Sequence, residues 1–216
     1  MTLGQIKSYV WSMVDDLGGN YFTTDELTRY ANQMMRETQK LLIQAGNNWY
    51  TTIDATQSTV INQGNYTLPT DFLKMNRIEL VQNSGPNETR YSPKSITLNQ
   101  KDSISFDSDV AGFYILKNTL WFAPFPQTVK TIRMYYTYRV AEMTLDADTP
   151  DVPAEYHEYI ADRVAEICFL KDGRDASFIR YKCDKVEQFL NRDAIERNQD
   201  QSSKVVIVDE DNGVYG

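Results

Sequence analysis

Apolar residues recur every three or four positions in the first part of the chain, which is the spacing of an amphipathic α-helix. In the first segment they are Ile6, Val10, Met13, Val14 and Leu17. We expect this helix to end at Gly18-Gly19, because glycine favours helix C-termini. Thr23 and Glu26 have the spacing of a capping box, and a second helix is predicted from about Thr24 to Ala45.

From Trp49 onward the pattern changes to short runs rich in Thr, Val, Ile and Tyr, separated by turn residues, which is typical of strands. The segments 113–116 and 119–123 predict a hairpin joined by Lys117-Asn118. Residues 131–138 alternate and predict a strand with one apolar and one mixed face. All seven prolines lie between Pro69 and Pro153, which excludes long helices from this region. The middle of the chain is therefore predicted to form a small antiparallel sheet or sandwich.

Helical spacing returns after Pro153, which suits the first turn of a helix. The periodic apolar residues here are Tyr156, Tyr159, Ile160, Val164, Ile167 and Cys168. Gly173 is expected to break this helix. A last helix is predicted with an apolar face and opposite charges on its other face. Its apolar residues are Phe178, Ile179, Tyr181, Val186, Phe189 and Leu190.

These elements predict the α+β class: a helical bundle built from N- and C-terminal helices, with an inserted antiparallel β domain and an extended C-terminal tail. The predicted ranges are 1–48 for the N-terminal helices, 49–150 for the β insertion, 151–197 for the C-terminal helices and 198–216 for the tail. Two helices before the sheet and two after it pack together only if the sheet is an excursion from the helices.

The tail contains a candidate binding segment of strong β-propensity. Four β-branched apolar residues stand together and acidic residues follow, so an unpaired strand here is prone to aggregate. We predict that it adds to the edge of a partner's sheet, and the alternative is that it completes a sheet of its own chain. The partner-binding residues of this prediction are Lys204, Val205, Val206, Ile207, Val208, Asp209, Val214 and Tyr215.

Charge and cysteine content narrow the function classes. The chain has 22 Lys and Arg against 30 Asp and Glu, a net charge of −8, which disfavours tight binding to nucleic acid because that affinity comes mainly from basic side chains. Two cysteines and one histidine provide neither a disulfide framework nor a four-ligand zinc site, and they fit a reducing compartment. The N-terminus lacks the unbroken apolar run of a signal peptide, and the longest apolar runs are too short to span a membrane.

Each candidate for chemistry has a simpler structural explanation. We expect His157 at the solvent-facing start of a helix, as a surface or packing residue rather than a general base, and Cys168 and Cys183 in the core. The acidic stretch between Arg139 and Arg163 invites a calcium site, but an EF-hand counted from Asp146 needs Gly at 151 and Glu at 157. Gly-rich phosphate loops do not occur in the sequence, and most aromatic residues stand at core spacings. The sequence therefore predicts no enzyme, no cofactor and no metal.

Three stretches together resemble the head-to-tail adaptor (connector or neck) proteins of tailed bacteriophages, over roughly residues 24–190. A Leu-Pro-x-Asp-Phe turn leads into a strand, a hairpin ends in Pro-x-Pro, and a Pro-started helix bears Tyr-His. The matching residues are Leu68, Pro69, Asp71, Phe72, Pro124, Pro126, Pro153, Tyr156 and His157. These are scaffold residues rather than chemical ones.

The resemblance implies a structural virion protein at the head–tail interface, made in the host cytoplasm. It implies a homo-oligomeric ring, commonly of twelve copies, beneath the portal protein, which extends the DNA channel without gripping DNA and provides the attachment site for tail or nozzle proteins. Two alternatives stay open. One is a carbohydrate-binding or host-recognition module of a virion that uses the aromatic residues of the sheet, and the other is an enzyme whose site the sequence does not reveal.

Overall fold

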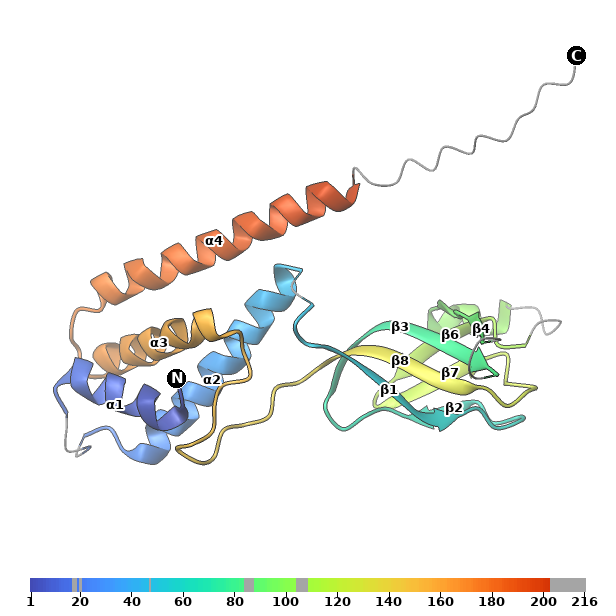
Figure 1. Ribbon diagram of the computed structural model, residues 1–216, viewed down its shortest axis with the longest axis horizontal. Helices are drawn as coiled ribbons and strands as arrows, with labels where there is room; N and C mark the ends of the chain where they lie inside the picture. Colours follow the sequence, from blue (N-terminus) through green and yellow to red (C-terminus); the bar gives the residue numbers. More distant parts are fainter. Residues whose placement is uncertain (17–18, 20, 47, 84–87, 104–108, 203–216) are drawn as a thin grey trace, which may run out of the picture. The chain divides into compact units, whose positions relative to one another are not determined.

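The computed structural model describes residues 1–16, 19, 21–46, 48–83, 88–103 and 109–202 (Figure 1). The chain divides into two compact units. The helical unit comprises residues 1–49 and 140–216, and the sheet unit comprises residues 50–139. The described α-helices and strands thus lie in separate units, and the predicted α+β class is confirmed.

The helical unit is built around α3, which packs against the three other helices of the described chain. The helices are α1 (Leu3–Val14), α2 (Thr24–Gln44), α3 (His157–Lys171), which follows the short 3-10 helix η2 (Ala154–Tyr156), and α4 (Ser177–Ser202). Ile160, Ala161, Val164, Ala165 and Cys168 of α3 are all fully buried. A helix surrounded in this way carries buried residues on most of its circumference rather than on one stripe.

The ends of α1 and α2 show where local sequence signals were sufficient. Thr23 caps α2 as predicted, and its side chain accepts a hydrogen bond from the Glu26 backbone at 3.3 Å. The predicted end of the first helix at Gly18-Gly19 is wrong, because α1 ends a turn earlier, at Val14. Asp15 takes the left-handed conformation (φ 59°) there, and the Asp16 carboxylate accepts hydrogen bonds from the two backbone amides at 21 and 22.

The sheet unit contains two four-stranded sheets in its described residues. One has the order β1-β8-β3-β4 and the other β2-β7-β6-β5. The strands are β1 (Thr51–Ser58), β2 (Asn65–Thr67), β3 (Phe72–Gln82), β4 (Thr89–Tyr91), β5 (Lys94–Ser95), β6 (Gly112–Leu116), β7 (Thr119–Ala123) and β8 (Thr131–Tyr138), with the 3-10 helix η1 (Leu98–Ser103) after β5. The predicted hairpin is confirmed as β6 and β7, with Lys117 at φ 55° in its turn. The expectation of a wholly antiparallel sheet needs one correction, because β5 pairs with β6 in parallel.

The core of the sheet unit is formed by inward-facing side chains of both sheets. Ile132, Met134 and Tyr136 alternate along β8 and are buried, as the predicted two-faced strand requires. Leu120 and Phe122 of β7 belong to the same cluster. Several of the aromatic residues in the middle of the chain lie in or against this core.

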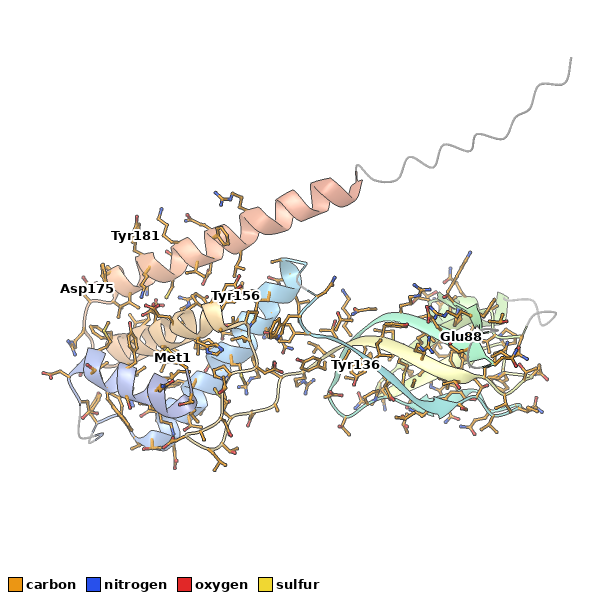
Figure 2. The ribbon with its side chains drawn as sticks, in the orientation of Figure 1. Met1, Glu88, Tyr136, Tyr156, Asp175 and Tyr181 are labelled. Atoms are coloured by element: carbon orange, nitrogen blue, oxygen red, sulfur yellow. The ribbon has the colours of Figure 1, made fainter. Side chains whose placement is uncertain are left out.

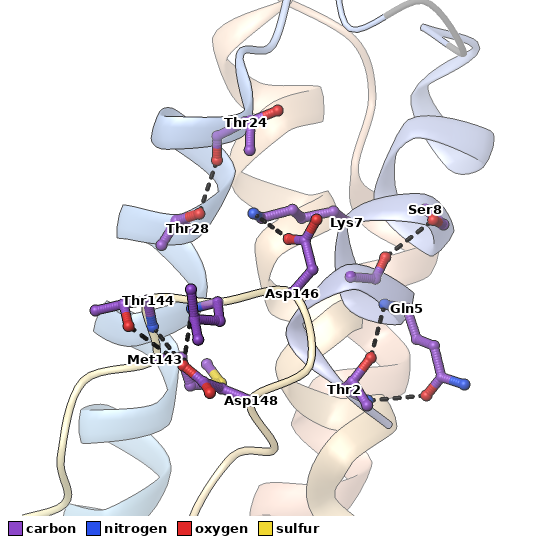
Figure 3. Close-up of polar contacts among 12 residues, drawn as sticks. Thr2, Gln5, Lys7, Ser8, Thr24, Thr28, Met143, Thr144, Asp146 and Asp148 are labelled. Carbon is purple, nitrogen blue, oxygen red and sulfur yellow. Dashed lines mark hydrogen bonds and ion pairs between the residues drawn. The ribbon is translucent and has the colours of Figure 1, made fainter.

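The segment that follows β8 is held by the helices. The side-chain amide of Asn32 on α2 both donates to and accepts from the backbone of Met143, at 2.9 and 2.8 Å. Lys7 of α1 pairs with Asp146 at 2.8 Å (Figure 3). Residues 140–150, which we assigned to the β insertion, therefore lie in the helical unit. Their place depends on partners more than 100 residues away in the sequence.

Candidate interaction surfaces

The residues that carry the family resemblance position the ends of elements. Asp71 accepts a hydrogen bond from the Tyr136 hydroxyl at 3.0 Å, and its carbonyl accepts one from the Arg139 amide at 2.7 Å. Burial, together with the bond to Asp71, raises the pKa of Tyr136 to about 12. The Phe72 amide donates to the Pro69 carbonyl, which closes the turn before β3. The Leu-Pro-x-Asp-Phe turn thus fixes the end of β8 beside the start of β3.

The two other motifs of the family resemblance, Pro-x-Pro and the proline before the third helix, also position the ends of elements. We call the three motifs landmarks. The Pro126 carbonyl accepts the Asn62 amide at 2.9 Å just after the hairpin. Pro153 precedes η2, and its carbonyl accepts the Tyr156 amide at 2.9 Å. A proline has no amide hydrogen to leave unsatisfied at such a start. All three landmarks are therefore scaffold features, as expected from their residue types.

His157 is a packing residue. We expected a surface or packing residue at the solvent-facing start of a helix. His157 does start α3, but the solvent-facing position is wrong, because the residue is only 5% exposed. Its Nε2 lies 3.1 Å from the Val152 carbonyl, and its Nδ1 lies 2.6 Å from the amino nitrogen of Met1. Burial lowers the pKa of His157, and the nearby amino group acts in the same direction. A neutral ring that joins the chain before α3 to Met1 is a structural element.

The two cysteines lie in the core, as predicted. Cys168 and Cys183 are fully buried, and burial raises the pKa of each thiol to about 12. A thiol with so high a pKa is a weak nucleophile at neutral pH, because the thiolate is the reactive form. Both cysteines fill space at the centre of the helical unit.

The acidic stretch after β8 closes its own turn. The Asp148 carboxylate accepts the backbone amides of Thr144 and Leu145 at 2.7 and 2.8 Å (Figure 3). These bonds lower the pKa of Asp148. In the part of the chain that the structure describes, no three His, Cys, Asp or Glu side chains form a cluster able to hold a metal ion. This stretch shapes a loop and presents negative charge at its surface.

A network of charged side chains fixes α4 against α3. Glu166 of α3 is nearly buried and accepts from Arg163 at 2.6 Å and from Arg180 at 2.9 Å. Arg163 also donates to Glu187 of α4 at 2.8 Å, and Glu187 accepts the Tyr159 hydroxyl at 2.6 Å. Burial disfavours the charged form of Glu166, but the bonds from the two arginines outweigh it and lower its pKa. The network sets which side of α4 faces inward.

A second polar cluster joins α1, α3 and the start of α4. The buried Asp162 carboxylate accepts the Tyr9 hydroxyl at 2.7 Å and the Lys182 ammonium at 2.8 Å. Lys182 also contacts Glu158 at 2.6 Å, and these bonds raise the pKa of Lys182. Burial, reinforced by the bond to Asp162, raises the pKa of Tyr9 to about 12. The Asp162 carboxylate thus connects three helices. The orientation of α4 is determined both by this cluster and by the network around Glu166.

The outward side of α4 carries aromatic residues. Phe178, Tyr181 and Phe189 expose 78%, 61% and 50% of their surfaces. The Lys185 ammonium lies 5.2 Å from the centre of the Tyr181 ring, and the Arg192 guanidinium lies 5.3 Å from that of Phe189. We call these five residues the α4 stripe. Figure 2 shows Tyr181 on the side of α4 that points away from α3.

The α4 stripe corrects the predicted apolar face of the last helix. From the sequence we expected its aromatic residues on the same side as Ile179, Val186 and Leu190. In the structure Ile179, Cys183 and Leu190 are buried on the inner side, and the stripe faces outward. The signal was present in the sequence, because successive residues of a helix are about 100° apart and the two sets fall on different arcs.

The sheet unit has a smaller aromatic feature. The rings of Tyr114 and Trp121 are stacked, with centroids 6.2 Å apart and planes 6° from parallel. Both are half-buried and belong to neighbouring strands β6 and β7. Tyr114 also borders a hollow of about 430 Å³ that Met75 and Leu98 help to line. The sheet unit thus has a pair of half-buried, stacked aromatic rings next to this hollow.

The predicted C-terminal binding strand lies outside the described residues. This holds for Lys204, Val205, Val206, Ile207, Val208, Asp209, Val214 and Tyr215. The helix α4 runs to Ser202, so residues 198–202, which we placed in the extended tail, are helical. Strand donation by residues 204–215 stays a prediction.

Comparison with known protein families gives one match that covers most of the chain. A family model described as SU10 adaptor protein matches residues 1–204, which is a wider span than the resemblance seen in the sequence. No curated protein matches the chain. None of the described helices combines the length and apolar character that crossing a membrane requires.

Proposed function

The chain belongs to the SU10 adaptor protein family, and from this we infer that it is a structural, non-enzymatic head-to-tail adaptor of a tailed-phage virion. We propose that copies form a ring beneath the portal protein, most simply of twelve, which extends the DNA channel and provides the attachment site for tail or nozzle proteins. The observation that carries the proposal is the family match over residues 1–204, together with the landmark residues that position the ends of β8, β7 and η2.

The charge of the chain supports a channel that does not grip DNA. With 30 acidic and 22 basic residues, the chain has few cations left to displace counterions from phosphates. Much of the basic complement is also paired within the fold, as Arg163 and Lys182 are with carboxylates of α3 and α4. We therefore expect weak, salt-sensitive contact with DNA at most.

Binding to the portal protein tests this proposal. The purified chain is mixed with the portal protein of the same virion and imaged by electron microscopy. We expect a symmetric ring bound to one end of the portal, with a central opening. A chain that stays off the portal, or that binds it as single scattered copies, contradicts the adaptor function.

We propose that the helical unit faces the portal and neighbouring copies, while the sheet unit reaches toward the tail. The separation of helices and strands into two units supports this assignment of roles. Lys117, in the exposed turn of the β6–β7 hairpin, provides a chemical probe. Cross-links from Lys117 to the portal, and none to tail proteins, reverse the orientation.

The C-terminal segment is proposed to clamp the assembly. Residues 204–209 combine four β-branched residues with the acidic side chain of Asp209, so they suit addition to a sheet edge of the portal or of an adjacent copy. Deletion of residues 204–216 is expected to leave the melting temperature nearly unchanged and to abolish attachment to the portal. Loss of folding, or docking with full affinity, contradicts strand donation.

The Tyr114–Trp121 pair keeps one alternative in view, a carbohydrate-binding or host-recognition module of a virion. A partly exposed pair of aromatic rings beside a hollow suits contact with a sugar ring. Screening against bacterial glycans decides between the two functions. If the monomeric chain binds a glycan, and the substitution Trp121→Ala abolishes that binding, the module is favoured over the adaptor.

A further inference from the structure

The α4 stripe is not needed to hold its own chain together. The inner side of α4 already packs on α3 through Ile179, Cys183 and Leu190, and the charged network with Arg163 fixes the helix there. The stripe instead presents three large aromatic side chains to water, flanked by Lys185 and Arg192. Aromatic and basic residues gathered on one exposed face are typical of protein-binding surfaces.

The charge on the stripe indicates what it binds. A complementary surface has to carry carboxylates and an apolar group, because two of the three aromatic rings of the stripe, Tyr181 and Phe189, each lie beside a cation. The segment 140–156, which we call the acidic loop, has five carboxylates and no Lys or Arg. Leu145 projects from it with 65% of its surface exposed. Asp151 and Glu155 make no ion pair within the described chain, so their charges are available.

The two surfaces belong to different sides of the same helical unit. The acidic loop is fastened to α1 and α2 through Lys7 and Asn32, whereas α4 packs mainly on α3. Figure 1 shows α4 and the start of the acidic loop on opposite sides of α3. A surface and its complement on opposite sides of one unit join copies head to tail, and such contacts close into rings when the rotation between copies permits.

We propose that the α4 stripe of one copy docks on the acidic loop of the next copy. Phe178, Tyr181 and Phe189 cover Leu145, while Lys185 and Arg192 face the free carboxylates of the loop. The inference rests on the proposed adaptor function for its biological setting. Its geometry rests only on the helical unit, and the partner is a second copy of this chain.

The size of the stripe sets the strength of the contact. From residue 178 to residue 192 the helix advances about 21 Å, and with a width of about 10 Å the stripe covers roughly 200 Å². Stable interfaces bury about 800 Å² on each partner, so this contact alone is weak. We expect self-association of the free chain only at high concentration, strengthened when a portal aligns the copies.

A cross-linking experiment tests the contact directly. Tyr181 is replaced by the photo-reactive residue p-benzoylphenylalanine, which keeps an aromatic ring at that position. Heavy-nitrogen-labelled and unlabelled full-length chains are mixed at up to about 1 mM, a concentration at which even contacts with a dissociation constant of about 1 mM are populated. We expect cross-linked peptides that join α4 of one label to residues 140–156 of the other. Cross-links between copies that fall elsewhere, cross-links within one copy only, or none at all overturn the proposal.

Charge exchange tests the pairing. Lys185→Glu with Arg192→Glu is expected to weaken self-association about tenfold in sedimentation equilibrium, and so is Asp151→Lys with Glu155→Lys. The chain that carries all four changes should recover most of the loss, because opposite charges face each other again. If the variant with all four substitutions associates no more strongly than either double variant, the proposal is overturned.

The matched control has the same charge change on the sheet unit, at Lys94→Glu with Lys117→Glu, and should associate as the wild type does. Thermal unfolding of every variant verifies that the helical unit is intact. All of these measurements use this chain alone. If the wild type fails to bind its portal, the adaptor function falls and the contact between copies stands. If the charge exchange does not restore self-association while the portal ring still forms, the contact between copies falls and the adaptor function stands.

Discussion

Replacing Glu166 by Gln should loosen α4 from α3. Glu166 exposes 7% of its side chain and receives one bond from each of Arg163 and Arg180. Gln keeps one acceptor oxygen but puts an amide donor where the second guanidinium donates, so one charge-assisted bond is lost and the other is weakened. Bonds to charged groups contribute about 1.5–3 kcal/mol each, and Arg180 is half exposed, so we expect a loss of about 2 kcal/mol in the free energy of unfolding.

The control for this substitution is Glu158→Gln, on the same helix. Glu158 exposes 63% of its side chain and pairs with Lys182 at 2.6 Å. An exposed pair contributes about 0–1 kcal/mol, so the same chemical change should have a small effect there. Urea unfolding is followed by the helical circular dichroism signal, because the described helices α1 to α4 belong to the helical unit. Equal losses in the two variants refute the role assigned to the buried network.

The effect of Glu166→Gln should also depend on pH in one direction. The two arginines lower the pKa of Glu166 in the folded chain below its value in the unfolded chain. The ionised carboxylate therefore contributes stability above about pH 4.3, and the contribution is lost as the pH falls through the lower folded value. The difference between wild type and Glu166→Gln should be full at neutral pH and shrink in acid. A difference that grows in acid contradicts this reasoning.

Two further predictions concern the thiols and the hairpin. Cys168 and Cys183, whose pKa values burial raises to about 12, should resist iodoacetamide in the folded chain at neutral pH and react in urea, as mass spectrometry will show; rapid labelling of the folded chain contradicts their burial. Lys117→Gly should raise the free energy of unfolding of the sheet unit by about 0.5–1 kcal/mol, because Lys117 has φ 55° and glycine adopts that conformation without steric cost. Asn118→Gly is the control at the neighbouring position. A Lys117→Gly variant that is less stable than the wild type contradicts the backbone strain at Lys117.

Local signals in the sequence determined the kinds of element and many of their bounds. Thr23 began α2 at the predicted residue because an N-cap depends only on the next few amides. The β6–β7 hairpin and the two-faced strand β8 followed from alternation and turn residues, which act over similarly short distances. The family resemblance was also visible in the sequence, since its landmarks are the prolines, acids and aromatics that end elements, and the family match supports it.

Tertiary structure decided which sides of these elements are covered. Burial of His157 depends on Val152 and on Met1, which is 156 residues away. The place of the acidic loop depends on Asn32. The parallel pairing of β5 with β6 needs a crossover connection rather than a tight turn, and no short sequence pattern encodes it. For α4 the sequence supplied apolar residues on two arcs of one helix. Apolar packing on α3, together with the bonds to the buried carboxylates of Glu166 and Asp162, determines which arc faces inward. The aromatic arc was left in water because α4 packs mainly on α3, and a helix that packs on other helices from one direction buries only that side.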